Sequence, residues 1–157
     1  LMKRAYEILT DLHCPFVINQ NRYSIFDRTI ENNGLKRESV NLRRGIIAFS
    51  PLAQGMLTDR YLNGIPEDSR IKKDGRFLKE SALTEDKLES IRGLAAVAKA
   101  RGQTLAEMAL AWILRDGAVT SVLIGASKPS QITENIKAIE NTHFSAEELR
   151  SIDALSR

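Results

Sequence analysis

The sequence predicts an α/β fold with a parallel sheet, because short apolar runs alternate with longer segments of helical periodicity. The three apolar runs are residues 15–20, 45–50 and 121–124, and their length and composition are typical of buried strands. A sheet of only three such strands would leave edge strands of the buried type uncovered. Residue 1 also lies within an amphipathic helical pattern. We therefore expect residues 1–157 to form a single partial domain, a fragment of a larger one.

Helix signals fill most of the chain between these strands. Thr104–Glu107 and Ser145–Glu148 both show the capping-box pattern that begins a helix. Residues 51–81 lack clear periodicity and contain several Gly and Pro residues, so we expect a long loop that is functional or disordered. The expected helices cover residues 1–12, 27–44 with a break at 32–34, 84–102, 104–116, 129–139 and 145–155, with Trp112 as a core anchor.

Composition excludes several classes of function. The chain has 157 residues, is 43% hydrophobic and carries a net charge of +3, so it can bury a core but has no concentrated basic tract for nucleic acid. It has no apolar run long enough to span a membrane and no signal-peptide pattern. Its two histidines are far apart, and no metal site is expected. We interpret Cys14, the single cysteine, as a packed structural thiol in a reducing, cytoplasmic protein.

The segment 121–135 carries the strongest indication of a binding site. An apolar strand is followed by the small residues 125–127 and then by Pro129, where a helix begins. Free backbone N–H groups and the positive end of the helix dipole meet at such a junction and favour an anion. Ser127 and Lys128 could add a hydroxyl group and a positive charge. The spacing alone leaves two interpretations open, a phosphate site and a turn that binds nothing.

Three segments resemble the C-terminal half of the aldo-keto reductases. They are Asn-Gln-Asn-Arg-Tyr-Ser at 19–24, Ile-Ala-Phe-Ser-Pro-Leu-Ala-Gln-Gly-Met-Leu-Thr at 47–58 and Leu-Ile-Gly-Ala-Ser-Lys-Pro-Ser-Gln-Ile-Thr-Glu-Asn at 123–135, in the order of the family. The resemblance covers essentially the whole chain. It is strongest to bacterial aldehyde reductases related to the voltage-gated potassium-channel β subunits, which residues 61–66 and 110–115 also match. It implies the C-terminal portion of a (β/α)8 TIM barrel, starting in the helix after strand five, with strands six to eight, their helices and a long cofactor loop.

The resemblance also implies that this chain is the NADP-binding half of the barrel. Gln20 would hydrogen-bond the nicotinamide carboxamide, and Phe49 would lie flat against the nicotinamide ring, where many family members have Tyr or Trp. Arg60 and Arg70 match basic positions that meet the cofactor phosphates, although both could be ordinary surface arginines. The remaining implied contacts are Ser50, Pro51, Leu52 and Gly55 around the pyrophosphate, and Gly125, Ser127, Gln131, Glu134 and Asn135 at the adenosine end.

The adenosine end indicates NADP rather than NAD. The Ser127 hydroxyl group and the positive charge beside it favour a 2′-phosphate. Gln131 is a departure, because an Arg at this position would clamp the phosphate more strongly.

The resemblance implies NADPH-dependent reduction of aldehydes or ketones by the complete protein, with small carbonyl substrates of the glyceraldehyde or methylglyoxal type. No catalytic residue is assigned to this chain, because the family's Asp, Tyr, Lys and His set belongs to the N-terminal half. Tyr23 and Tyr61 lack a Lys and His constellation in the sequence. A homo-oligomer of the complete protein is left open, and no nucleic-acid or membrane partner is expected.

Two other functions follow from the same residues. The first is a non-catalytic, redox-sensing interaction module that binds NADP(H), as the resemblance to channel β subunits allows. The second is a self-assembling half barrel, which is disfavoured because two copies would supply too few strands to close the barrel.

Overall fold

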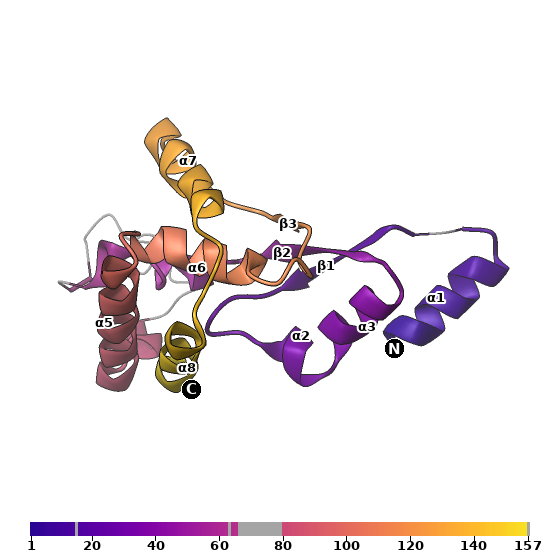
Figure 1. The fold of residues 1–157 in the computed structure, drawn as a ribbon, viewed down its shortest axis with the longest axis horizontal. Helices are drawn as coiled ribbons and strands as arrows, with labels where there is room; N and C mark the ends of the chain where they lie inside the picture. Colours follow the sequence, from indigo (N-terminus) through magenta and orange to yellow (C-terminus); the bar gives the residue numbers. More distant parts are fainter. Residues whose placement is uncertain (15, 63, 66–79, 157) are drawn as a thin grey trace.

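The computed structural model describes residues 1–14, 16–62, 64–65 and 80–156, and a parallel three-stranded sheet lies at its centre (Figure 1). The strands are β1 (Ile18–Arg22), β2 (Gly45–Phe49) and β3 (Ser121–Val122), in the order β1–β2–β3. The predicted α/β class and parallel sheet are confirmed. β1 begins later than predicted, with Ile18 paired to Gly45. β3 ends sooner than predicted, near the point where a left-handed turn at Ser50 ends the neighbouring strand β2.

The helices follow the sequence signals closely. Both predicted capping boxes form, and Gly34, with a φ of 77°, makes the predicted break between two helices. The helix predicted over 129–139 divides into an α-helix and a 3₁₀ helix. Residues 51–62 contain only 3₁₀ turns, as expected for a loop, and residues 66–79 of that predicted loop lie outside the described residues. The elements are α1 (Met2–Asp11), α2 (Thr29–Asn32), α3 (Leu35–Asn41), η1 (Ala53–Gly55), η2 (Asp59–Tyr61), η3 (Glu80–Ala82), α5 (Glu85–Ala100), α6 (Leu105–Leu114), α7 (Pro129–Asn135), η4 (Ile136–Glu140) and α8 (Ala146–Leu155).

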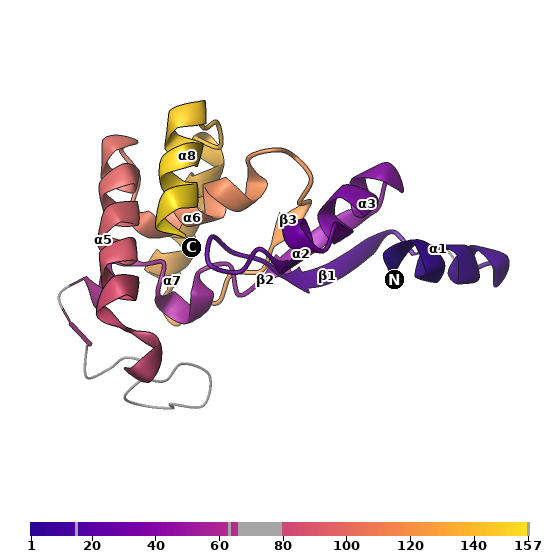
Figure 2. The ribbon, with the colours of Figure 1, turned by 90° about the horizontal axis from the view of Figure 1, so that it is seen from below.

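One face of the sheet is buried under helices. Ile46 and Ala48 of β2 are fully buried, and almost every residue of α6 is buried as well. Trp112 is the core anchor that the sequence predicts, and its ring lies 5.3 Å from the ring of Tyr23. Figure 2 shows α5, α6 and α8 gathered at one end of the molecule, with α2 and α3 toward the other end. The core therefore extends along one side of a small sheet.

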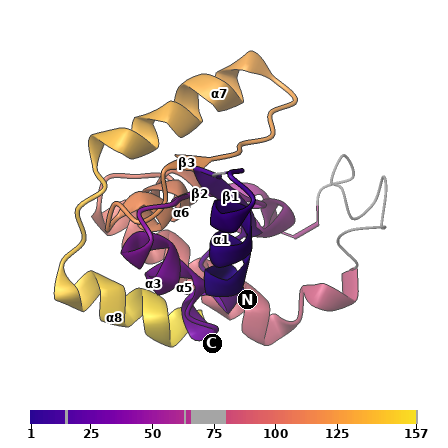
Figure 3. The same ribbon diagram turned by 90° about the vertical axis from the view of Figure 1, so that its right-hand side faces the viewer.

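The other face of the sheet is open. Phe49 is 36% exposed at the end of β2, and Ile18 and Leu123 on the neighbouring segments are exposed too. α7 lies on the side of α6 away from α5 and α8 (Figure 3), and both α7 and its continuation η4 pack on α6. The apolar side chains Ile132, Ile136 and Ile139 of α7 and η4 are also exposed. The described residues thus leave one sheet face and one helix stripe without cover.

A partly buried polar network joins α2 and α3 to the end of α6. The hydroxyl group of Tyr23 donates to Glu31 and accepts from Lys36 at 3.2 Å and from Arg115 at 3.0 Å. Arg115 also pairs with Glu31 at 2.8 Å, and Lys36 pairs with Asp116 at 2.6 Å. Burial alone would raise the pKa of Glu31, but hydrogen bonds from Tyr23 and Arg115 outweigh it and hold that pKa below its ordinary value.

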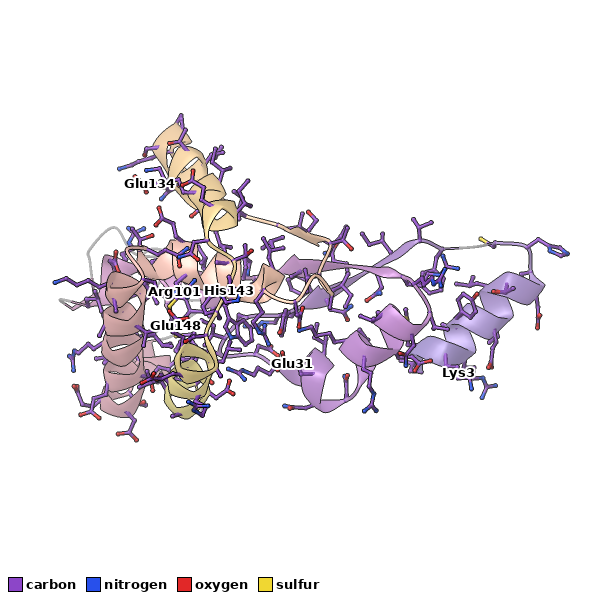
Figure 4. All side chains as sticks on the ribbon, in the orientation of Figure 1. Lys3, Glu31, Arg101, Glu134, His143 and Glu148 are labelled. Carbon is purple, nitrogen blue, oxygen red and sulfur yellow. The ribbon has the colours of Figure 1, made fainter. Side chains whose placement is uncertain are left out.

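The C-terminal segment is attached to the body by Arg101, whose side chain is only 3% exposed. Its guanidinium carbon lies 3.7 Å from the ring centroid of Phe144, and the same group pairs with Glu148 at 2.8 Å. It also donates to the backbone carbonyl groups of Asn141 and His143 at 3.1 and 2.9 Å. Figure 4 shows Arg101, His143 and Glu148 close together. These contacts fix the link between η4 and α8 against the end of α5.

One interpretation from the sequence is wrong. Cys14 is exposed rather than packed, because α1 buries no residue and the chain leaves it through a left-handed turn at His13, with a φ of 53°. Within the described ranges, no helix is both long and apolar enough to cross a bilayer. The same residues contain no group of three or more His, Cys, Asp and Glu side chains that could hold a metal ion.

Arg43 offers a test of backbone strain. It follows α3 with a left-handed φ of 52°, and the N–H groups of Arg43 and Arg44 donate to the carbonyl groups of Val40 and Ser39. This helix end favours glycine. We expect Arg43→Gly to raise the free energy of unfolding by about 0.5–1 kcal/mol in urea titrations, since relief of strain exceeds the entropy that glycine adds to the unfolded chain. Arg43→Ala keeps the strain and should bring no such gain. Equal stability of the two variants would contradict the prediction.

The lowered pKa of Glu31 predicts how stability depends on pH. A carboxyl group whose pKa is lower in the folded state binds fewer protons there than in the unfolded chain, so it stabilises the fold above its unfolded pKa. That contribution is lost as the pH falls below about 4.5, the ordinary value for glutamate, toward the folded pKa. We expect Glu31→Gln to flatten the fall in unfolding free energy over this acidic window. An unchanged slope in denaturant titrations from pH 6 down to about pH 3 would contradict it.

Candidate functional site

The carboxyl ends of β2 and β3 open onto a cleft of about 970 Å³. One wall is the loop that follows β2, from Ser50 to Tyr61, and the other is the segment from Leu123 through α7. Ligands of parallel α/β proteins bind at this edge of the sheet. The predicted cofactor residues that line the cleft are Ser50, Pro51, Leu52, Gly55, Arg60, Gly125, Ser127, Gln131, Glu134 and Asn135.

The first wall is a strained turn. Ser50, Ala53 and Gln54 adopt left-handed φ angles of 54°, 47° and 63°, which are unfavourable for residues other than glycine. Backbone hydrogen bonds hold the turn closed, among them Gly55 N–H to Leu52 carbonyl at 2.8 Å. Strained backbone of this kind collects at ligand sites, where neighbouring structure enforces it. The loop is therefore shaped before any ligand binds.

The second wall presents hydrogen-bond donors at the start of α7. Pro129 is the first residue of this helix, as the sequence predicts. The side-chain oxygen of Gln131 accepts from the backbone N–H groups of Ser127 and Lys128 at 2.7 and 3.2 Å, and from the Ser127 hydroxyl group at 3.3 Å. The amide oxygen of Gln131 thus takes the place of an anion, and an anion bound to these donors would displace it.

Asn135 and Glu134 complete this wall from the next turn of α7. Asn135 is 9% exposed, lines the cleft and has no hydrogen-bond partner among the described residues. The amide atoms of Asn135 are not fully enclosed, so they are accessible from the cleft and available to a ligand. Glu134 is exposed on the same short helix (Figure 4).

Gln20 and Phe49 lie outside this lining, on the open face of the sheet. Gln20 pairs with Ile47 in the parallel register of β1 and β2, and Phe49 lies two residues further along β2, so both side chains project from the same face. Asn19, on the opposite face, donates to Ser39 at 3.2 Å and to the Gly45 carbonyl at 2.8 Å, which fixes the side from which Gln20 emerges. Arg70 lies outside the described residues.

Several residues that line the cleft are not predicted as site residues from the sequence. Thr104 carried the signal of a helix cap, which it is, and it also lines the cleft. Gln54 and Thr58 fall inside a segment that matches the family, but nothing in their residue type marks them. Tyr61 is buried and lines the same wall. The match of the whole segment 47–58 to the family was the signal that could have found Gln54 and Thr58.

A lysine lies beside Tyr23, but among the described residues its hydroxyl group bonds to no histidine, so the predicted lack of a Lys and His constellation stands. Lys36 lies 3.2 Å from its hydroxyl group, with Asp116 behind the lysine, because the chain folds α3 back toward the end of β1. The arrangement does not make Tyr23 an acid catalyst. Tyr23 is fully buried and donates to Glu31, and burial raises the pKa of its hydroxyl group well above the ordinary value. A hollow of about 700 Å³ borders Lys36 and Asp116 but does not reach Tyr23.

Comparison with known proteins identifies the family. The model of the aldo/keto reductase family matches residues 2–157, so the chain belongs to that family. An L-glyceraldehyde 3-phosphate reductase of Escherichia coli O157:H7 is 47% identical over 154 residues, which are 96% of this chain and 44% of the relative. A probable voltage-gated potassium channel subunit beta of Oryza sativa subsp. japonica is 37% identical over 127 residues, 79% of this chain and 38% of the relative. The predicted family and branch are confirmed, and the chain spans less than half the length of these relatives.

Solved structures show the same fold. A glycerol dehydrogenase from Gluconobacter oxydans superposes with a TM-score of 0.77 at 24% identity, over 99% of this chain and 46% of its own. A thermostable aldo-keto reductase solved with the inhibitor epalrestat gives a TM-score of 0.66 at 26% identity, over 95% of this chain and 43% of its own. The arrangement of β1–β3 and their helices is therefore shared with part of a larger α/β fold.

Proposed function

We propose that this chain is the cofactor-binding, C-terminal half of an NADPH-dependent aldo-keto reductase that reduces aldehydes or ketones to alcohols. In this assignment β1, β2 and β3 are strands six, seven and eight of a (β/α)8 barrel. Membership of the family and 47% identity to a reductase support the reaction class. The observation that carries the proposal is the cleft at the ends of β2 and β3, where a strained backbone turn faces the donors of α7.

The described side chains fit an extended dinucleotide. Asn135 offers an amide that lines the cleft, and the N–H groups of Ser127 and Lys128 offer donors that Gln131 now occupies. These groups would hold the adenosine end and its 2′-phosphate. The turn from Ser50 to Gly55 would hold the pyrophosphate, because glycine and left-handed residues bring backbone N–H groups close to a ligand.

The open face of the sheet would receive the nicotinamide end. When bound, the nicotinamide supplies a hydride to the carbonyl carbon of the substrate. Gln20 would orient the ring through its carboxamide group. Phe49 would cover one side of the ring and exclude water there, so that only the other side meets the substrate. The proton donor would come from the Tyr of the family's catalytic set, outside this chain. Small aldehydes of the glyceraldehyde or methylglyoxal type are the proposed substrates.

A second function deserves a test because of one comparison. A relative at 37% identity is described as a probable potassium channel subunit beta. The chain could accordingly belong to a redox-sensing module that binds NADP(H) without turnover. The two functions differ in the catalytic Tyr, Lys and His set, which the full gene either encodes or lacks.

Titration of the protein expressed from its full gene with NADPH and with NADH tests the proposed function. We expect quenching of intrinsic fluorescence with tighter binding of NADPH, because donors converge on the position of the 2′-phosphate. Turnover of a small aldehyde with NADPH would then separate the reductase from the sensing module. Absence of binding by a folded protein would refute both.

Ser127→Ala tests the proposed 2′-phosphate contact. The substitution removes a hydroxyl donor but leaves the backbone N–H groups of the turn in place. We expect the affinity for NADPH to fall by about 10–100-fold, the effect of losing one hydrogen bond to a charged group. The affinity for NADH should change far less. Equal losses for the two cofactors, measured by the same titration, would place the phosphate elsewhere.

A further inference from the structure

A backbone hydrogen bond to the carbonyl group of Phe49 helps to fix the position of this residue. The backbone N–H of Tyr23 donates to that carbonyl at 3.3 Å, as the last hydrogen bond between the ends of β1 and β2. The next residue, Ser50, turns into the left-handed region with a φ of 54°. The direction in which Phe49 projects is therefore set where a strand ends and a strained turn begins, and Tyr23 is the neighbour that holds this point.

Tyr23 is itself immobilised by its side chain. Its hydroxyl group is bound by Glu31, Lys36 and Arg115, which belong to three different parts of the chain. Its ring packs at 5.3 Å from the ring of Trp112, and the side chain is fully buried. The formal charges of Glu31 and Asp116 balance those of Lys36 and Arg115. Loss of the phenolic oxygen would leave the buried cation of Lys36 and the half-buried cation of Arg115 without one of their acceptors.

We propose that Tyr23 is a positioning residue for the nicotinamide end of the cofactor site, acting on Phe49 through its backbone N–H. This inference rests on the proposed function, because it assumes that Phe49 covers the nicotinamide ring. Tyr23 touches neither cofactor nor substrate. Its phenol group fixes the end of β1, and the backbone N–H at this end holds the carbonyl group of Phe49. The adenosine wall is carried by α7, which packs on α6 and η4. Tyr23 reaches Phe49 through a direct backbone hydrogen bond, whereas it reaches α7 only indirectly, through Trp112 of α6, so we expect a change at Tyr23 to act chiefly on the nicotinamide end.

The test compares two ligands that share the adenosine end. NADPH reaches both ends of the site, whereas adenosine 2′,5′-bisphosphate carries the 2′-phosphate and lacks the nicotinamide. Tyr23→Phe keeps the ring and removes only the hydroxyl group. In the protein expressed from its full gene, we expect this variant to bind NADPH about 5–10-fold more weakly, while binding of the bisphosphate changes less than about 2-fold.

Two further variants show what the comparison means. Phe49→Ala removes the positioned ring, so it should also weaken the binding of NADPH and leave the binding of the bisphosphate nearly unchanged. Ile152→Ala creates a cavity on α8, remote from Phe49, and should lower the melting temperature without altering the ratio of the two affinities. If Ile152→Ala changes the ratio of the two ligand affinities as Tyr23→Phe does, the change in this ratio comes from lost stability, and the inference is overturned.

The remaining outcomes are also decisive. If the wild-type protein binds neither ligand, the proposed function itself fails. If it binds both and Tyr23→Phe weakens them equally, or weakens neither, the function stands and the role of Tyr23 is refuted. If Tyr23→Phe fails to fold, Glu31→Gln tests the same inference with the same two ligands. This variant weakens the hydrogen bond that holds the phenol group of Tyr23 and retains a hydrogen-bonding side chain.

Discussion

The rest of the molecule depends on the packing of α6 against one face of the sheet. This helix is apolar on nearly all sides and has almost every residue buried. It contacts β3, α5, α7 and η4, and α5 in turn packs on α8, so α6 joins the sheet to these helices. Burial of so much apolar surface is the main favourable term available to a small sheet. The two walls of the cleft hold their separation because both are attached to this core.

The second constraint is a charged cluster at the edge of that core, around Trp112 and Tyr23. Two guanidinium groups lie against the faces of Trp112, with Arg28 4.6 Å and Arg115 3.8 Å from its ring. Buried ions are costly unless they are paired and hydrogen-bonded. Here Glu31 pairs with Arg115 and Asp116 with Lys36. The indole N–H of Trp112 has no hydrogen-bond partner among the described residues, so packing and ring–cation contacts stabilise this side chain instead.

Sequence patterns located the elements well where the signal is local. Capping boxes and Pro129 mark helix starts, because a side chain bonds to backbone within the same turn. The left-handed end of α3 was not foreseen, since Arg43 occupies a position where glycine would have announced it. Cys14 was misjudged because its burial depends on how α1 packs. The Tyr23 cluster brings together residues that are distant in sequence, and no periodicity encodes such a contact.

The candidate site could also be predicted from the sequence only in part. The family motifs placed its residues, and the structure gathers most of them around one cleft. The bond between Gln131 and the turn at Ser127 could not be anticipated, because it depends on a side-chain rotamer. The assignment to strands six, seven and eight stays a prediction, as does each residue's contact with a cofactor.

The composition of the cleft has a consequence for how a ligand arrives. Among the described lining residues, Arg60 and Lys128 are balanced by Asp59 and Glu134, and the Tyr23 cluster is balanced as well. Charges that sum to zero within one cleft produce little potential beyond a Debye length, which is about 8 Å at physiological ionic strength. These residues therefore exert no long-range steering on an anion in solution. The contribution of these residues to the rate of encounter with a ligand is therefore insensitive to salt. They discriminate between ligands only when a ligand is within hydrogen-bonding distance.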